Sequence, residues 1–288
     1  MGVPTQAFGK LQVSASTGEF VAHPGRGPFL CPKRVAPIES ASMKHLSKRT
    51  PLASLASILL VLGAVAGCAS EPQAVVAPQA EASVKPGIND NFLDPELNVD
   101  EYVERFEGES REVFANRVAI VAAMGIQSGK AVADVGAGTG PFIGLFAEAV
   151  GKSGKVYALD IAPNFVVHLA ERAKQEGHAQ IEARLCGENS LNLPAGSIDY
   201  AYICDVYHHF EFPRSTMASL HSALRKGGEV VIVDFEKIPG VTREWIMGHV
   251  RASKQEVIAE LDSFGFDFVE ELEVEGVEDN WVGRFRKR

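Results

Sequence analysis

Cysteine is scarce in this chain of 288 residues, and none of its four cysteines stands in a Cys-x-x-Cys pair. No histidine pair completes a zinc-binding spacing either, so the sequence predicts no metal site. Cys186 and Cys204 fall near the ends of two expected buried strands, where a thiol usually serves as a small apolar core residue. The cysteines therefore give no sign of metal chemistry.

The folded part of the chain also lacks a stripe of basic residues. Residues 1–68 hold seven Lys and Arg against two Asp and Glu, whereas the whole chain has a formal net charge of −9. The remaining residues are therefore strongly acidic and would be repelled by phosphate backbones, so we expect no nucleic acid as a partner. The hydrophobic fraction of 46% is ordinary for a soluble protein and allows a packed core.

No apolar run reaches the ~20 residues that a membrane-spanning helix needs. The run 52–67 follows a basic stretch that begins at Met43, and it ends on Val-Ala-Gly-Cys at residues 65–68. A basic start, an apolar centre and small residues before a cleavage site are typical of a secretory signal peptide. The last four residues resemble a bacterial lipoprotein processing site, with Cys68 as the lipidated amino terminus. An ordinary membrane anchor or a buried helix stays open as an alternative.

This interpretation divides the chain into four parts. They are a non-native upstream extension at 1–42, a lipoprotein signal peptide at 43–68, a flexible tether rich in Ala, Pro and Val at 69–97, and a folded domain at 98–288. Acyl chains on Cys68 would attach the protein to a membrane. We expect it in the bacterial cell envelope facing the periplasm, or in the cytoplasm if the signal is not used.

From Asn98 onward, short apolar runs alternate with helical patterns. Strands are expected at 131–135, 156–160, 181–185, 198–204 and 229–235, and helices at 98–106, 110–124, 142–150, 164–176 and 213–224. This alternation indicates βαβ units with helices on both faces of the sheet. A helix at 254–264 and strands at 266–274 and 281–286 follow. The predicted class is α/β: a Rossmann-like, doubly wound sheet of about seven strands, mostly parallel, with an antiparallel C-terminal strand.

A glycine-rich loop at 136–140 follows the first expected strand. Glycines permit a tight turn and the close approach of a ligand, and the next helix presents free amide groups. A dinucleotide fingerprint would place a third glycine at position 141, which is Pro141. Asp134, just before the loop, would repel a pyrophosphate and attract an ammonium or sulfonium group. The loop therefore favours a cofactor that carries an amino acid over a dinucleotide.

The segment 132–140 resembles the first motif of class I S-adenosylmethionine-dependent methyltransferases, and the resemblance covers about residues 100–288. Asp160 ends the second strand 24 residues after Gly136, where an acid can accept hydrogen bonds from both ribose hydroxyls. The family commonly has Gly-Asp-Ala where this chain has Gly187-Glu188. The residue that contacts the adenine can therefore be shifted by one position in this chain. The resemblance implies S-adenosyl-L-methionine as cofactor, bound by Asp134, Gly136, Ala137, Gly138, Thr139, Gly140, Asp160, Ile161, Gly187, Glu188 and Asp205. Either Asp134 or Asp160 could instead only cap the following helix.

The end of the fourth strand, residues 205–210, faces the expected place of a methyl acceptor. Methyl transfer mainly requires alignment of the reactants, and a base where the acceptor must lose a proton. His208 and His209 are the candidate catalytic bases, with Asp205 as an orienting partner or a cofactor contact. Alternatively, one histidine packs in the fold and the other only lines the pocket.

Two further groups lie beside these motifs. Glu109 and Arg111 either form a lid or belong to an ordinary charged helix surface, and Trp245, His249 and Arg251 stand where this fold often selects its substrate. The leading hypothesis is methyl transfer to an unidentified small-molecule acceptor. No Asn/Asp-Pro-Pro-Tyr motif is present, which counts against planar nitrogen acceptors. The alternatives are a non-catalytic lipoprotein that binds S-adenosylmethionine or a nucleoside, and an NAD-dependent oxidoreductase.

Overall fold

The computed structural model describes residues 80–109 and 111–288. The chain divides into two units, 1–71 and 72–288, and all described residues belong to the second. The expected upstream extension, the signal peptide with Cys68, and residues 69–79 of the tether lie outside the described residues. Within the described part, no helix is both long enough and apolar enough to cross a membrane.

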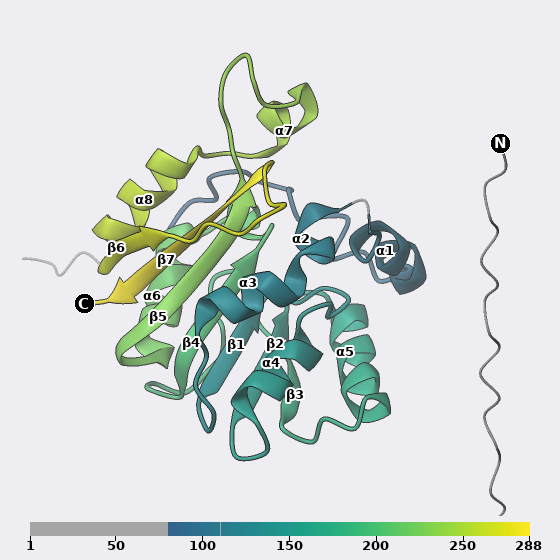
Figure 1. The fold of residues 1–288 in the computed structure, drawn as a ribbon. Helices are drawn as coiled ribbons and strands as arrows, with labels where there is room; N and C mark the ends of the chain where they lie inside the picture. Colours follow the sequence, from purple (N-terminus) through teal and green to yellow (C-terminus); the bar gives the residue numbers. More distant parts are fainter. Residues whose placement is uncertain (1–79, 110) are drawn as a thin grey trace, which may run out of the picture. The chain divides into compact units, whose positions relative to one another are not determined.

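Seven strands form one sheet in the order β3-β2-β1-β4-β5-β7-β6 (Figure 1). Their bounds are β1 Ala131–Val135, β2 Lys155–Asp160, β3 Ile181–Leu185, β4 Ile198–Cys204, β5 Leu224–Phe235, β6 Phe266–Glu271 and β7 Asn280–Lys287. Strands β1 to β5 pair in parallel, whereas β7 is antiparallel to both β5 and β6. The predicted α/β class, with a mostly parallel sheet and an antiparallel C-terminal strand, is confirmed.

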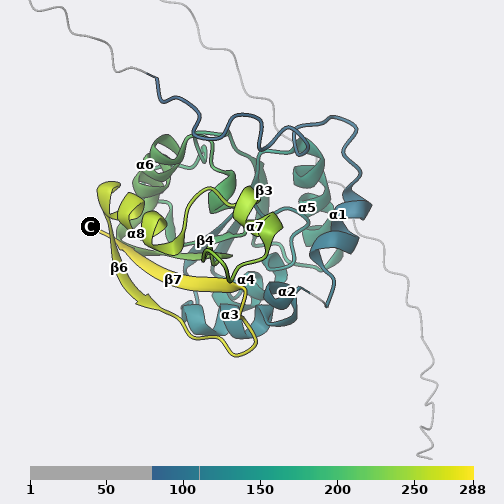
Figure 2. The same ribbon diagram turned by 90° about the horizontal axis from the view of Figure 1, so that it is seen from above.

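Helices cover both faces of this sheet. They are α1 Val99–Phe106, α2 Glu112–Ala115, α3 Arg117–Met124, α4 Ile143–Val150, α5 Pro163–Gln175, α6 Pro213–Ala223, α7 Glu244–His249 and α8 Lys254–Ser263, with a 3-10 turn, η1, at Tyr207–His209. Figure 2 shows α6 and α8 on one side of the sheet and α3 and α4 on the other. The two largest buried apolar clusters among the described residues lie under α6 and α8 and under α3 and α4. Burial on both faces explains why the central strands read as continuous apolar runs.

Two local differences from the sequence prediction bear on the site. The helix expected at 110–124 is broken into α2 and α3 at Asn116, whose side-chain amide donates to the carbonyl oxygens of Glu112 and Gly276. An asparagine that bonds the backbone in this way competes with helical hydrogen bonding. Helix α7 was not predicted, and it brings His249 to the carboxyl ends of the strands, where α1 and α2 also lie (Figure 1).

Residues 80–97 pack against the domain. The amide of Val84 donates to the carbonyl oxygen of Glu211 at 2.9 Å, and the side chain of Asn89 donates to the carbonyl oxygen of His209 at 3.1 Å. Leu97 is buried beside Phe165 at the start of α5. The tether predicted for 69–97 therefore does not extend through residues 80–97, and these residues instead form part of the wall of the candidate site.

Candidate cofactor and acceptor site

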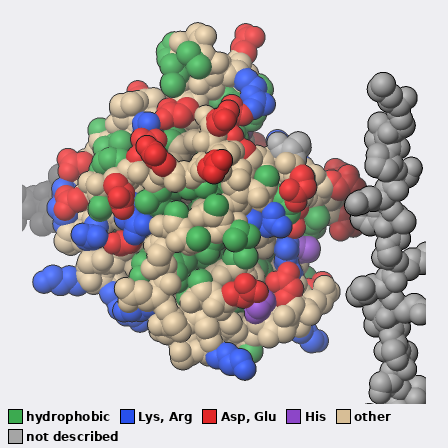
Figure 3. Space-filling view, viewed as in Figure 1, with side chains coloured by type: hydrophobic (Ala, Val, Ile, Leu, Met, Phe, Trp, Pro, Cys, Tyr) green, Lys and Arg blue, Asp and Glu red, His purple; other side chains and the backbone are tan. Residues whose placement is uncertain are grey.

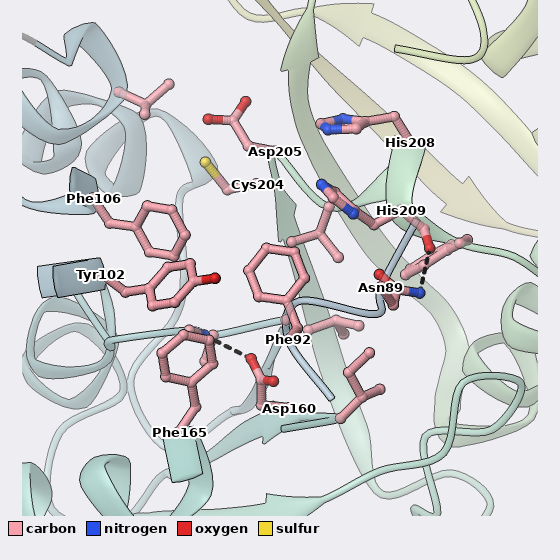
Figure 4. Close-up of a pocket in the computed structure, with 18 of the residues that line it drawn as sticks. Asn89, Phe92, Tyr102, Phe106, Asp160, Phe165, Cys204, Asp205, His208 and His209 are labelled. Atoms are coloured by element: carbon pink, nitrogen blue, oxygen red, sulfur yellow. Dashed lines mark hydrogen bonds between the residues drawn. The ribbon is translucent and has the colours of Figure 1, made fainter. Parts of the chain in front are cut away.

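A cavity of about 590 Å³ lies at the carboxyl ends of the parallel strands. Its volume is typical of a site for a small molecule. Figure 4 shows Tyr102, Phe106 and Phe165 on one side of the cavity and His208 and His209 on the other, with Phe92 between the two groups. The cavity therefore combines an apolar aromatic wall with a polar end at the termini of β4 and β5.

The glycine loop turns sharply between β1 and the wall of the cavity. Gly136 has a φ of 73°, and a Cβ there would come within 2.6 Å of the methyl groups of Val206. Gly138 has a φ of 55° and faces the Phe106 ring, with an added Cβ 3.5 Å from it. Glycine adopts these positive φ values without strain, and at Gly136 it also avoids the clash with Val206. Gly136, Ala137 and Gly138 line the cavity, as predicted for a cofactor loop.

The other two residues of the predicted loop lie outside the cavity lining. Gly140 has a φ of 86°, and a Cβ there would meet the side chain of Leu169 at 2.7 Å, so this glycine allows α5 to pack closely. Thr139 is fully buried, and its carbonyl oxygen accepts a hydrogen bond from Arg172. We therefore assign Thr139 and Gly140 to the support of the loop rather than to ligand contact.

Asp160, at the end of β2, ties the glycine loop to the next strand. One carboxylate oxygen accepts from the amide of Gly138 at 2.8 Å and the other from the amide of Ala162 at 2.9 Å (Figure 4 shows the first of these). Burial raises the pKa of Asp160 to about 6, although both backbone bonds favour the ionised form. Each oxygen keeps a second lone pair, so the carboxylate can still accept from two hydroxyl groups in the cavity that it lines with Ile161.

Asp134 lies just before the glycine loop, and its Oδ2 atom has no hydrogen-bond partner among the described residues. The residue is 3% exposed. Burial, and then the charge of Asp160, raise the pKa of Asp134 to about 8. Helix α4 receives no side-chain cap, so the helix-capping alternative for Asp134 is wrong. A buried, unpartnered carboxyl group that lines a cavity indicates a cationic ligand.

The segment after β3 forms the rim on the opposite side of the loop. Gly187 pairs with Ser190 in an isolated bridge, and the carbonyl oxygen of Glu188 accepts from the Thr216 hydroxyl at 3.0 Å. Both Gly187 and Glu188 line the cavity, with the Glu188 side chain exposed. Cys186 also lines it, and burial raises the pKa of its thiol to about 12, so the thiol is neutral. This agrees with its interpretation as a small apolar residue.

Asp205 does not orient a histidine, which corrects one of its two predicted roles. Its carboxylate pairs with Arg111 and accepts from the Asn280 side chain at 2.6 Å. Burial raises the pKa of Asp205 to about 6, against the opposing effect of Arg111. Arg111 therefore belongs to the site, and the reading of it as an ordinary surface residue is wrong. Glu109 remains largely exposed, near Arg117.

His208 is oriented by Asp234, which the sequence analysis did not single out. Its Nδ1 lies 2.7 Å from Oδ1 of Asp234, and its backbone amide donates to Oδ2 at 3.2 Å. Both side chains are only 3% exposed. Asp234 is the one acid in the apolar run Val230-Val231-Ile232-Val233-Asp234 at the end of β5. That position, equivalent to those of Asp134 and Asp160, was a signal that could have identified it.

His209 lies beside a third histidine that α7 contributes. The Nε2 atoms of His209 and His249 are 3.3 Å apart, and the His209 ring meets Phe92 edge-on. Burial lowers the pKa of His209 to about 3, with further contributions from His208 and His249. The ring is therefore neutral near pH 7 and would be a weak proton acceptor. Of the two predicted bases, only His208 has a carboxylate partner among the described residues.

Residues 132–228 match the family model described as "Methyltransferase domain". The match begins in β1 and ends in β5, and it includes the glycine loop, Asp160 and the histidine pair. The prediction of a methyltransferase domain is confirmed for this segment.

Curated relatives agree with this domain over a limited length. The chain is 28% identical to a demethylmenaquinone methyltransferase of Geobacillus sp. over 38% of this chain and 47% of that protein. It is 26% identical to the ubiquinone/menaquinone biosynthesis C-methyltransferase of Hydrogenovibrio crunogenus, over 40% of this chain and 45% of that protein. The chain thus spans less than half of the length of these two relatives.

A solved structure with the same fold is a SAM dependent methyltransferase from Aquifex aeolicus. It superposes with a TM-score of 0.57 at 21% identity, covering 66% of this chain and 97% of the other. The likeness supports the Rossmann-like fold that the sequence predicted. These comparisons agree with the prediction of an S-adenosylmethionine-dependent methyltransferase.

Proposed function

We propose that this protein is an S-adenosylmethionine-dependent methyltransferase whose acceptor is a small, planar and largely apolar molecule with an ionisable hydroxyl group. The observation that carries the proposal is the pair of buried acids at adjacent strand ends. Asp134 has an unpartnered oxygen, and Asp160 keeps free lone pairs beside the glycine loop. Acids of this kind match the ammonium and the ribose hydroxyls of this cofactor.

The residues of the cavity fit the cofactor part by part. Asp134 would hold the cationic amino-acid end, with Gly136 and Gly138 leaving room for close contact, and Asp160 would accept from the ribose. Gly187 and Glu188, which also line the cavity, would contact the adenine. When bound, the cofactor supplies an activated methyl group on a sulfonium. The chain's own task is then to exclude water and to align the acceptor with that methyl group.

The acceptor class follows from the opposite part of the cavity. Phe92, Phe235 and Trp245 line the walls near the histidines and offer flat apolar surfaces to a planar ring. Lys and Arg on the face seen in Figure 3 are interspersed with Asp and Glu and form no continuous basic surface. Relatives named for demethylmenaquinone and for ubiquinone/menaquinone biosynthesis support a quinone-type acceptor.

His208 is placed to act on the acceptor hydroxyl. Asp234 fixes its Nδ1, which leaves Nε2 as the nitrogen free to accept a proton. The low pKa of His209 makes that ring a poor base near neutral pH, because an efficient general base has a pKa near the working pH. The catalytic hypothesis of the sequence therefore narrows from two histidines to His208, with Asp205 acting through Arg111 and Asn280 on the shape of the site.

The test is calorimetric titration of the full chain with S-adenosylmethionine, followed by a radiolabelled transfer assay. We expect binding, and transfer of label to a quinol-type acceptor. Heat without transfer to any extract would support the alternative of a non-catalytic binding protein. Absence of heat, beside a methyltransferase that binds in the same buffer, would refute the proposal.

We also propose that lipidated Cys68 holds the protein at a membrane, facing the periplasm. The support is the sequence pattern at 43–68, which resembles a lipoprotein signal. Attachment at a membrane would bring the cavity near apolar acceptors dissolved there. Replacing Cys68 with Ala should abolish fatty-acid labelling and move the protein to the soluble fraction, and an unchanged distribution would refute this assignment.

A further inference from the structure

Three histidines converge at the acceptor end of the cavity from two segments that are far apart in the sequence. His208 and His209 belong to η1 after β4, and His249 ends α7. One ring nitrogen of each lies within 4.8 Å of the others, and the ring centroids are 4.4 to 5.1 Å apart. All three line the cavity. Their sequence spacing matches no zinc pattern, which is why the sequence predicted no metal site.

We infer that His208, His209 and His249 bind a divalent transition-metal ion, with zinc as the best fit, at the acceptor end of the cavity. The inference rests on the proposed methyltransferase function only for the ion's role, not for the site itself. Imidazole nitrogens suit zinc, and three protein ligands leave a fourth position open, as in catalytic zinc sites.

The distance between two of the nitrogens already suits a shared ion. The Nε2 atoms of His209 and His249 are 3.3 Å apart. Zinc at about 2.0–2.1 Å from each of two tetrahedral ligands places those ligands roughly 3.3–3.4 Å apart. A hydrogen bond between the two rings would also give this distance, and in both cases Nδ1 of His209 is buried without a partner among the described residues. The convergence of a third ring nitrogen, that of His208, on the same point is what favours an ion.

The third histidine has the support that metal-binding histidines usually have. A ring that binds metal through one nitrogen commonly donates the other N–H to a carboxylate, which fixes its tautomer and orientation. Asp234 accepts from Nδ1 of His208 at 2.7 Å, and both groups are almost fully buried. This contact leaves Nε2 of His208 as the nitrogen open to an ion. Asp234 would therefore be a positioning residue for the site.

The charges that face the cluster are mixed. Asp234 and Asp205 act from the strand ends, whereas Lys85 and Arg105 face it from the N-terminal segments. Lys85 directs its ammonium group to the carbonyl oxygens of Gly248 and His249, so that charge is partly engaged at the end of α7.

An ion here would change the role of His208. As a ligand the ring cannot serve as a base, and the open position of the metal would instead hold the acceptor hydroxyl. Coordination lowers the pKa of a bound hydroxyl group, so its proton can leave to water near neutral pH. The oxygen would then be held at a fixed point beside the aromatic wall. A ligand set of this kind would select acceptors with a hydroxyl group over those with none.

The test is calorimetric titration of the untagged, metal-free full chain with ZnCl₂, alongside His249→Ala and His208→Ala. We expect one zinc ion per chain, a loss of at least about 100-fold in affinity in either variant, and a loss of about 10- to 100-fold in Asp234→Asn. His221→Ala, on α6 away from the cavity, is the matched control and should bind as the wild type does. Cobalt substitution should give the intense visible absorption of a tetrahedral site.

S-adenosylmethionine binding, measured on the same samples, separates the possible outcomes. Zinc binding without cofactor binding would support the metal site and refute the proposed function. Cofactor binding by a wild-type chain that takes up no more zinc than His249→Ala would refute the metal site and leave the proposed function intact. Because His249 is only half-buried, its variant also decides the question if His208→Ala fails to fold.

Discussion

The two ends of the cavity are built in different ways. At the cofactor end, the glycine loop and Asp134 follow one another in the sequence, and the second acid lies 24 residues after Gly136. At the acceptor end, the residues come from segments far apart in the chain, namely Asn89, Arg111, Asp205, His208, Asp234, His249 and Asn280. The first end is a local motif, whereas the second is a product of tertiary packing.

The polar groups of the two ends also differ in how far the protein satisfies them. Asp134 has an oxygen with no partner among the described residues, as expected where a charged ligand supplies the missing contact. Asp205 is held by Arg111 and Asn280, and His208 by Asp234. Changes to the acidic side chains of the cofactor end should therefore act mainly on ligand binding. Changes at the acceptor end should act on stability, on its pH dependence and on the order of the site.

The largest effect is expected from Asp160→Ala. This change removes the proposed ribose acceptor and also the bond that holds the Gly138 amide. Loss of hydrogen bonds to a charged group costs about 1.5–3 kcal/mol each, so we expect cofactor affinity to fall by ~100-fold or more. Calorimetric titration measures it. Asp267→Ala, on the exposed edge strand β6, is the control and should bind normally. Equal affinity of Asp160→Ala and wild type would break the assignment of this end.

Gly136→Ala tests the loop through the stability of the fold. An added Cβ would lie 2.6 Å from Val206 at a φ of 73°. The left-handed conformation costs ~1–2 kcal/mol and overpacking typically another 1–3, so the free energy of unfolding should fall by about 2–5 kcal/mol. Gly177→Ala has a similar φ of 76° with nothing within 4 Å, and it should lose only the smaller, conformational part. If urea denaturation gives the two variants equal losses in the free energy of unfolding, the Val206 side chain must move aside and the close contact costs nothing.

The cofactor end of the cavity was predictable from the sequence to a greater extent than the acceptor end. The strand positions, the glycine loop and Asp160 were found because periodicity and a contiguous motif encode them locally. Asp234 was not identified, and Arg111 was named only as a candidate lid residue. Their roles depend on which strand ends meet and on a turn that brings Arg111 to Asp205. The proposed metal site depends on tertiary packing in the same way. Spacing rules recognise short motifs, whereas the proposed third ligand, His249, lies 40 residues after His209 and approaches the pair through α7.

Asp134→Asn should change how the affinity for S-adenosylmethionine depends on pH. The pKa of Asp134 is raised to about 8 in the free protein, so below pH 8 an ammonium-bearing ligand must displace its proton. We expect wild-type affinity for S-adenosylmethionine to increase between pH 6 and 8, by up to about tenfold per pH unit, and then to level off. The variant should bind about 10- to 100-fold more weakly at pH 8, with this dependence on Asp134 removed.

The stability of the same variant gives an independent check. A carboxyl group with a raised pKa favours the unfolded state as pH rises from its unfolded value near 3.8 to its folded value. Without ligand, Asp134→Asn should therefore lose less stability than wild type between pH 5 and pH 8. Thermal unfolding at the two pH values measures this, and identical slopes would contradict the buried, unpartnered state of Asp134.

The smallest effect is expected from Arg111→Ala at the acceptor end. Asp205 would lose the cation that lowers its pKa, and that pKa, already about 6, should rise further. At pH 8 the variant must either bury an uncompensated carboxylate or bind a proton, which should cost ~1–2 kcal/mol in the free energy of unfolding. At pH 5 Asp205 is mostly protonated in the folded wild type, so the cost should shrink.

Arg288→Ala breaks only exposed pairs and should cost almost nothing at either pH. A pH-independent loss in Arg111→Ala would mean that Arg111 acts through its packing on Phe106 rather than through Asp205.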